Sequence, residues 1–255
     1  GEAQTDMTWL WKPTDRAAPE CIIAEFIGSL LFQFIGGACS ANASHGFGGV
    51  ITAALGNGLA LTVCIFCTAK ISAAHLNPAV SFGFLAADIP TFQRGSFFGY
   101  VIAQISGAAF GAILLWLAMP AAAMDAPHGR GSFATLGMLS AHHPMAVFFG
   151  ELICTFILVF TVFGVVHSFN FGSTGPLAIG FALAASGFAI GPYTGCSLNP
   201  ARTLAPILLF GIGRFMWCYT VQLLGCLLGG YFAGKVYKRA FLPDDSSFKA
   251  GSDYQ

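Results

Sequence analysis

The sequence HLNPA at residues 75–79 returns as SLNPA at residues 197–201. Each copy lies within an apolar stretch that is too short to cross a bilayer, and Arg202 directly follows the second copy. An Asn before a Pro is typical of a helix start. The Asn side chain caps free backbone N–H groups, and Pro loses no hydrogen bond at the first helical position, where a backbone N–H has no partner within the helix. We therefore expect a short helix to begin at each copy. The two tripeptides are Asn77, Pro78 and Ala79, and Asn199, Pro200 and Ala201.

The composition is that of a membrane protein. Of the 255 residues, 56% are hydrophobic and only 9% are charged, whereas an average soluble domain has roughly 25% charged residues. The formal net charge is zero, so no basic surface predicts binding to nucleic acid. We expect a polytopic protein whose partners are the lipid bilayer, further copies of itself and small solutes.

The eight cysteines do not predict a disulfide scaffold or a metal site. Most of them lie in apolar runs, where free Cys behaves as a small hydrophobic residue. Cys64 and Cys67 form a C-x-x-C motif, but no second pair or His follows at the spacing of a zinc site. We expect no metal and no cofactor. The sequence also has no nucleophile–base pair or phosphate-binding Gly loop, which argues against an enzyme.

Six apolar stretches reach the roughly 20 residues that a spanning helix needs. They lie near residues 20–40, 49–69, 93–119, 144–168, 175–192 and 214–237. Two shorter stretches, near 77–87 and 199–210, should enter the membrane and stop. Irregular backbone at membrane depth is tolerated only within protein or along a water-filled cavity, so these stretches indicate an aqueous path. The predicted fold is an all-α membrane protein with six transmembrane helices and two re-entrant half-helices.

Both halves of the chain carry the same landmarks in the same order. Glu25 and Glu151 each stand four residues before a hydroxyl residue, in the first and fourth apolar stretches. The pattern Q-x-x-G-x-x-x-G occurs at 104–111 and again at 222–229, and one tripeptide falls between the landmarks of each half. Since each half has an odd number of spans, the halves must be inverted relative to each other in the membrane.

We expect one channel domain over residues 1–255 with both termini in the cytosol. Its parts are a cytosolic segment 1–19, a first half 20–119, an exterior loop 120–143, a second half 144–239 and a cytosolic tail 240–255. This orientation leaves only Arg130, Arg202 and Arg214 outside the cytosol, which satisfies the positive-inside rule. The home membrane is the plasma membrane or an internal membrane.

Half-helices that enter from opposite faces bring their N-termini together near the midplane. Each N-terminus carries roughly half a positive charge, and Asn77 and Asn199 add amide donors. A water molecule that accepts from both amides turns its own hydrogens outward, which interrupts a proton wire, while the positive potential repels cations. Arg202 adds a cationic barrier. The sequence therefore predicts a site that passes neutral molecules. The alternative, two helix caps in a packed bundle, leaves the duplication unexplained.

Other functions fit the sequence less well. An ion channel or secondary transporter would need carboxylates or a broken-helix ion site at the midplane, where this chain has Asn and Pro. A structural membrane protein with a closed pore is the other alternative. We expect Glu25 and Glu151 to accept hydrogen bonds from backbone N–H groups of the re-entrant loops rather than to relay protons.

These residues together resemble the aquaporins, the major intrinsic protein family. The resemblance covers about residues 20–240 and rests on the two tripeptides, the Arg that follows the second, the two glutamates and the Gln-x-x-Gly motifs. It implies six spans with two half-helices, a homotetramer with one pore per subunit, and passive flow of water or small uncharged solutes.

The resemblance also locates the family's aromatic/arginine selectivity filter, which would comprise Asn57, Gly187, Cys196 and Arg202 here. Strict water channels usually have Phe in place of Asn57 and His in place of Gly187, so we expect a wider constriction. Glycerol channels usually carry Asp after the Arg, whereas this chain has Thr203. We expect passage of water with a small polar solute such as glycerol, urea, ammonia or hydrogen peroxide. A strictly water-selective channel is the alternative.

By the same correspondence, apolar side chains should line the path and backbone carbonyls should form a polar track. The expected wall residues are Phe32, Leu61, Val80, Leu158 and Leu183. The expected carbonyls belong to Ala73, Ala74, His75, Gly195, Cys196 and Ser197. For any single Leu, ordinary core packing explains the residue equally well. Cys196 should lie at the outer mouth, within reach of a mercurial.

Overall fold

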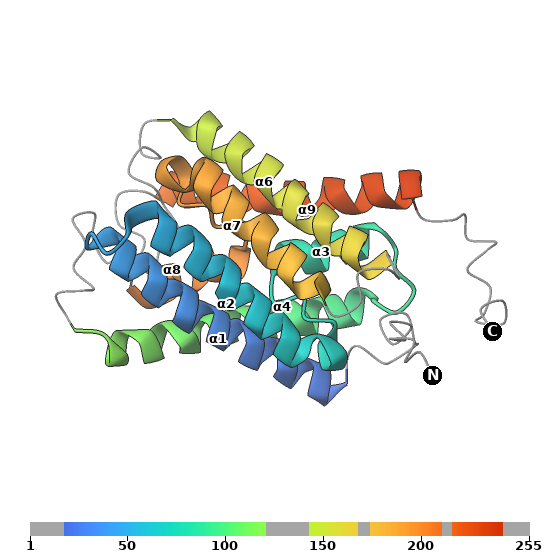
Figure 1. Ribbon diagram of the computed structural model, residues 1–255. Helices are drawn as coiled ribbons and strands as arrows, with labels where there is room; N and C mark the ends of the chain where they lie inside the picture. The colour runs from blue at the N-terminus through green and yellow to red at the C-terminus, as the bar shows by residue number, and fades with distance from the viewer. Residues whose placement is uncertain (1–17, 121–142, 168–173, 211–215, 242–255) are drawn as a thin grey trace, which may run out of the picture.

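The computed structural model describes residues 18–120, 143–167, 174–210 and 216–241, and these residues form helices and no strand (Figure 1). The helices are α1 (Pro19–Ser44), α2 (Gly49–Ser72), α3 (Pro78–Ala86), α4 (Arg94–Ala118), α6 (Pro144–His167), α7 (Gly175–Thr194), α8 (Pro200–Phe210) and α9 (Met216–Phe241). Six are long and two are short, in the order that the sequence predicts. The exterior loop expected at 120–143 and most of both terminal segments lie outside the described residues.

Five of the described helices, α1, α2, α4, α6 and α7, have the length and apolar composition of membrane spans. Helix α9 is not among them, although its 26 residues match the length of α1. Trp217, Tyr219 and Gln222 make it less apolar, and Lys238 and Arg239 occupy its last turn. Because α9 packs along α6, it belongs to the same bundle as the five apolar helices.

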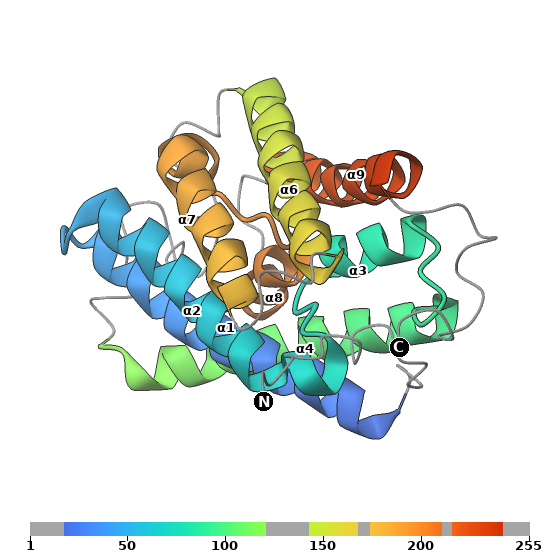
Figure 2. The ribbon, with the colours of Figure 1, turned by 45° about the vertical axis from the view of Figure 1, so that its right-hand side comes forward.

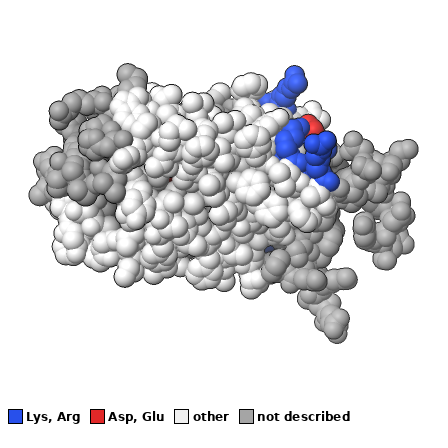
Figure 3. Space-filling view, turned by 90° about the horizontal axis from the view of Figure 1, so that it is seen from above, with Lys and Arg blue, Asp and Glu red and all other residues white. Residues whose placement is uncertain are grey.

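Large apolar side chains cover the outside of the bundle. Ile102 is 68% exposed, Leu117 is 67% exposed and Phe98 is 64% exposed. In the face shown in Figure 3, uncharged residues cover most of the middle, and the charged side chains of the described residues lie toward one end. An apolar surface of this extent is unfavourable in water but is solvated by lipid chains.

Glycines allow the long helices to approach closely in both halves. A Cβ atom on Gly107 of α4 would overlap the carbonyl of Phe26 in α1, and one on Gly229 of α9 would overlap the carbonyl of Leu152 in α6. The two glycines belong to the repeated Q-x-x-G-x-x-x-G pattern. The pattern therefore marks the same kind of helix contact in each half, where small residues bring backbones together.

Each short helix packs against a long helix from the other half of the chain. Helix α3 of the first half lies beside α9, and α8 of the second half lies beside α4 (Figure 2). Glycines again permit the contact, because a Cβ on Gly230 would overlap the carbonyl of Ala79. The halves are thus interlocked and form one unit over the described residues.

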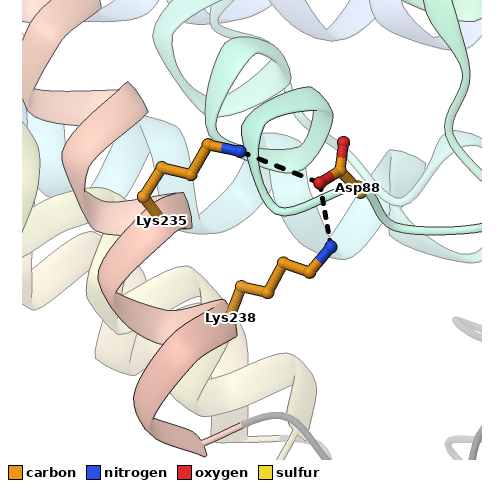
Figure 4. A network of polar contacts seen from close by, with 3 residues as sticks. All are labelled: Asp88, Lys235 and Lys238. Atoms are coloured by element: carbon orange, nitrogen blue, oxygen red, sulfur yellow. Dashed lines mark hydrogen bonds and ion pairs between the residues drawn. The ribbon is translucent and has the colours of Figure 1, made fainter. Parts of the chain in front are cut away.

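An ion-pair cluster fastens the far end of α3 to α9 (Figure 4). Asp88, two residues past the last residue of α3, accepts a hydrogen bond from Lys238 Nζ at 2.8 Å, and Lys235 Nζ lies 3.7 Å from the same oxygen. Asp88 has a left-handed backbone, with φ of +53°, which Asp adopts more readily than most residues. The cluster is solvent-exposed.

Candidate functional site

The two Asn side chains cap the short helices as the sequence predicts. Asn77 Oδ1 accepts from the backbone N–H of Ala79 at 2.8 Å, and Pro78 is the first residue of α3. Asn199 Oδ1 accepts from the N–H of Ala201 at 2.9 Å at the start of α8. The amide oxygens are therefore occupied by the caps, and the amide hydrogens remain for other partners.

Each Asn also binds the loop that holds the other Asn. Asn77 Nδ2 donates to the carbonyl of Leu198 at 2.7 Å, and Asn199 Nδ2 donates to the carbonyl of Leu76 at 2.8 Å. These reciprocal bonds join the N-termini of α3 and α8 at one point inside the bundle. Each bond uses one of the two hydrogens on its amide, so a second N–H donor remains on each side.

Glu25 holds the loop before α3. Its carboxylate accepts from the backbone N–H groups of His75 at 2.9 Å and Leu76 at 2.7 Å. It also accepts from Ser72 Oγ at 2.6 Å and from Gln104 Nε2 at 2.8 Å. The carboxylate is fully buried, and its four donors compensate for the water that it has lost.

Glu151 holds the loop before α8 in the same way. It accepts from the backbone N–H groups of Ser197 at 3.0 Å and Leu198 at 2.9 Å. Thr194 Oγ1 donates at 2.7 Å and Gln222 Nε2 at 3.1 Å. The two carboxylates thus bind their loops through corresponding donors. The duplicated sequence therefore gives duplicated hydrogen bonds in the two halves.

Both loops contain left-handed backbone at residues other than glycine. In the first loop φ is +68° at Ala73, +50° at Ala74 and +49° at Leu76, and in the second it is +50° at Cys196 and +51° at Leu198. Each such residue costs about 1–3 kcal/mol, so the loops keep this shape because the buried carboxylates bind their N–H groups. The carbonyls of both loops lie beyond the ends of α2 and α7.

Arg202 and Asn57 meet at a glycine of α1. A Cβ atom on Gly36 would overlap Asn57 Oδ1 and would lie 3.4 Å from Arg202 Nη2. Arg202 is only 4% exposed, and its guanidinium carbon lies 4.6 Å from the ring centroid of Phe32, a favourable cation–π arrangement. The structure therefore brings together two of the four residues expected in the filter and one expected wall residue.

The matches to known proteins extend over nearly the whole chain. A family model described as major intrinsic protein matches residues 14–237. The chain belongs to the major intrinsic protein family. Its relatives are channels, so this family member is a multi-pass membrane channel and not an enzyme.

Individual relatives agree with this membership. The chain is similar to aquaporin TIP2-1 of Zea mays, with 35% identity over 242 residues that cover 91% of each chain. It is also similar to aquaporin-4 of Mus musculus, with 34% identity over 235 residues that cover 88% of this chain and 68% of that protein. An aquaglyceroporin structure from Plasmodium falciparum aligns with a TM-score of 0.77 and 26% identity, covering 87% of this chain and 96% of that chain. The predicted aquaporin fold is confirmed.

The other two expected filter residues of this aquaporin-family chain have different surroundings. A Cβ atom on Gly187 would lie 2.9 Å from the Cβ of Ala54, so the missing side chain lets α7 close against α2. Gly187 therefore leaves little open space of its own, and a wider filter depends mainly on Asn57. Cys196 is 7% exposed, whereas Cys39 and Cys67 are more exposed, so a mercurial also has other thiols to attack.

Most of the residues expected to form the aquaporin path are buried. The side chains expected in the wall belong to a single apolar cluster, namely Phe32, Leu61, Val80, Leu158 and Leu183. The residues expected to supply carbonyls lie in the two left-handed loops, namely Ala73, Ala74, His75, Gly195, Cys196 and Ser197. Burial in a shared cluster fits both a lining role and ordinary packing.

A pair of hydroxyl residues, Ser81 and Thr203, also lies beside the two loops, and the sequence motifs drew attention to Thr203 alone. Ser81 Oγ lies 3.1 Å from His75 Nδ1 and accepts from Gln104 Nε2 at 3.0 Å. In the second half, Thr203 contacts Ser197 Oγ and donates to Gln222 Oε1 at 3.2 Å. Both hydroxyls stand four residues after an Asn of the tripeptides, so alignment of the two halves is the signal that finds them.

The His75 side chain lies among aromatic rings. The ring centroids of Phe84, Phe92 and Tyr100 lie 4.3, 4.6 and 5.1 Å from that of His75. These three rings surround the imidazole, while the His75 backbone N–H binds Glu25. Among the described residues, no group of three or more His, Cys, Asp or Glu side chains could hold a metal ion.

Proposed function

We propose that the chain is a passive channel for water and small uncharged polar solutes that excludes protons and other ions. The reciprocal bonds of Asn77 and Asn199 carry this proposal, because they join two helix N-termini at one buried point. Each N-terminus contributes roughly half a positive charge. A point of positive potential with unused N–H donors accepts the oxygen of a water molecule and rejects a cation.

Proton exclusion follows from the orientation that this point imposes. A water molecule that accepts from the remaining N–H groups of Asn77 and Asn199 directs both of its own hydrogens away from them. Water molecules on the two sides are then oriented in opposite directions, and a proton cannot pass along such a chain by hopping. Arg202 adds a second positive barrier along the same path.

Passage requires partners for water that do not hold it strongly. In this proposal the carbonyls of Ala73, Ala74, His75, Gly195, Cys196 and Ser197 form a ladder of acceptors. The apolar side chains of Phe32, Leu61, Val80, Leu158 and Leu183 face the ladder. An apolar wall with one row of polar groups allows rapid exchange between successive sites.

The orientation and assembly are also proposals. Lys235, Lys238 and Arg239 lie near the end of α9, and Lys70 lies in the last turn of α2. The positive-inside rule then favours a cytosolic position for these helix ends and for both termini. We propose that residues 1–255 form a single channel domain. We expect this domain to assemble as a homotetramer in the plasma membrane or an internal membrane.

Flux through reconstituted vesicles tests the proposal. Stopped-flow light scattering would compare water, urea and glycerol permeability in vesicles with and without the protein, and a pH-sensitive dye would report proton leak. We expect faster water and solute flow with no added proton leak. Water flow equal to that of bare lipid would overturn the channel, and a sizeable ionic current would overturn the exclusion of charge. Water flow without flow of any tested solute would favour the strictly water-selective alternative.

A further inference from the structure

Helices α1 and α2 together fix the side-chain amide of Asn57 in one orientation. Asn57 Nδ2 donates to the carbonyl of Ala53 at 2.8 Å and to Ser40 Oγ at 3.0 Å. Ser40 Oγ in turn donates to the carbonyl of Gly36 at 3.0 Å. Turning the amide over would place its oxygen against the Ala53 carbonyl, which is repulsive. The amide hydrogens are therefore satisfied, and the oxygen remains.

This oxygen lies beside Arg202 without bonding to it. Asn57 Oδ1 and Arg202 Nη2 both approach Gly36. Asn57 Oδ1 and Arg202 Nε are buried and have no hydrogen-bond partner among the described residues. A buried acceptor and a buried donor left unpaired are unfavourable, so the pair favours a passing molecule that satisfies both atoms.

The second half of the chain lacks this arrangement. Alignment of the two glutamates places Val162 and Val166 at the positions of Gly36 and Ser40, and alignment of the tripeptides places Ile179 at the position of Asn57. All three replacements are buried in the main apolar cluster. The helical repeat therefore accepts apolar residues at these places, and folding alone does not require the polar group around Asn57.

We infer that Asn57 and Arg202 form a donor–acceptor pair that recognises small planar amides, with urea as the simplest example. The inference rests on the proposed function and names a solute class for the same filter. A urea molecule carries a carbonyl oxygen, which accepts from Arg202, beside an N–H group, which donates to Asn57 Oδ1. One flat solute satisfies both atoms at once, whereas water or ammonia offers a single heavy atom.

Polyols fit this pair less well than amides. A hydroxyl group that donates to Asn57 Oδ1 also brings its own lone pairs close to that oxygen. A second hydroxyl group, on another tetrahedral carbon, must then reach Arg202. The Phe32 ring lies against the guanidinium and limits the width available to such a chain. Gly36 and Ser40 act as positioning residues, because Gly36 leaves space for the Asn57 oxygen and Ser40 holds the Asn57 nitrogen.

The test is the ratio of urea to water permeability in reconstituted vesicles. Asn57→Leu keeps the number and branching of the side-chain heavy atoms but removes the acceptor, and we expect the ratio to fall at least ten-fold while the urea-to-glycerol ratio also falls. Ser40→Ala removes one of the two acceptors that hold the Asn57 nitrogen and leaves only the Ala53 carbonyl, so we expect a several-fold loss. Val166→Ala, at the corresponding position of the other half, serves as the matched control and should leave the ratio unchanged.

The outcomes separate the inference from the function on which it rests. An unchanged urea-to-water ratio in both Asn57→Leu and Ser40→Ala overturns the inference, as does an equal loss of urea and glycerol flow. Wild-type vesicles that pass water but not urea also overturn it and leave the channel in place. Wild-type vesicles that pass neither overturn the proposed function itself. If Asn57→Leu does not fold, Ser40→Ala decides.

Discussion

The two halves of the chain agree at the centre of the bundle and differ away from it. At the centre, Asn77 and Asn199 make equivalent caps and reciprocal bonds. Away from it, Arg202 has Val80 as its counterpart by alignment of the tripeptides. In the proposed function, duplication therefore supplies the scaffold and the charge-excluding centre, whereas single unmatched residues at one end set solute choice.

The scaffold is where we expect the largest effect of a mutation. Glu25→Ala and Glu151→Ala each leave two buried backbone N–H groups without a partner, which should lower the free energy of unfolding by about 2–6 kcal/mol. If the halves share a scaffold, the two losses should be similar. Thermal unfolding in detergent, followed by circular dichroism, measures both, with Glu25→Gln and Glu151→Gln as milder controls. A loss confined to one variant would show that the loops are supported differently.

The charge of Arg202 is the next feature to test. Arg202→Val gives this end the residue of its counterpart, Val80, and removes one positive charge from the proposed path. A unit charge at contact distance contributes at least about 1 kcal/mol even in water and more in a low dielectric, so we expect a rise in proton leak of roughly ten-fold or more. A pH-sensitive dye inside the vesicles measures the leak. Val80→Ala is the control, and a leak that rises equally in both variants would remove the special role of Arg202.

A side chain at Gly187 should disturb the contact between α2 and α7. In Gly187→Ala the new Cβ would lie 2.9 Å from the Cβ of Ala54, and overpacking of this kind typically costs about 1–3 kcal/mol. We expect a lower unfolding temperature with urea flow reduced by less than in Asn57→Leu. Unchanged stability would mean that the helices separate freely, and Gly187 would then belong to the open part of the filter.

The thiol of Cys196 offers a chemical test of the same end. A mercurial should block most of the water flow, and Cys196→Ser should abolish the block. Cys196 lies in the left-handed loop that leads into α8, the helix that carries Arg202. Its counterpart Ala74 cannot react. Cys39→Ser and Cys67→Ser are the controls, since both thiols are more exposed than Cys196. A block that survives Cys196→Ser and disappears in either control would place the reactive thiol elsewhere.

The smallest effect is expected at the ion pair of Asp88. The second half has no counterpart of Asp88, because Phe210 stands at the corresponding position. The hydrogen bond from Lys238 lowers the pKa of Asp88 below 3.8. Its stabilisation is therefore present above pH 3.8 and is lost as the pH falls through the lowered pKa. The group is 62% exposed, so Asp88→Asn should cost less than about 1 kcal/mol at pH 7. Unfolding temperatures at pH 7 and pH 3 measure the effect, which should be smaller at the lower pH.

Local sequence rules predicted the elements and the centre of the site. An Asn-Pro pair starts a helix through its own backbone chemistry, so α3 and α8 begin where the tripeptides predict. Buried glutamates in apolar helices need donors, and each finds two backbone N–H groups of a re-entrant loop. These features follow from the residues themselves and from their immediate neighbours.

Contacts between distant helices could not be predicted in this way. Gly36 and Ser40 belong to no motif, and their effect on Asn57 appears only when α1 and α2 lie together. The closure of α2 against Gly187 likewise depends on the distance between two helices rather than on either sequence. Family correspondence gives the expected filter positions, but the direction of each side chain is a property of the packing.

The exchange of short helices between the halves has a consequence for how such a channel is built. Helix α3 packs on α9 and α8 packs on α4, so neither half encloses its own re-entrant segment. A single half could form this site only as two copies inserted in opposite directions. Expressed as two separate chains, the halves should be inactive alone and should restore water flow together, with each supplying the wall for the other's half-helix.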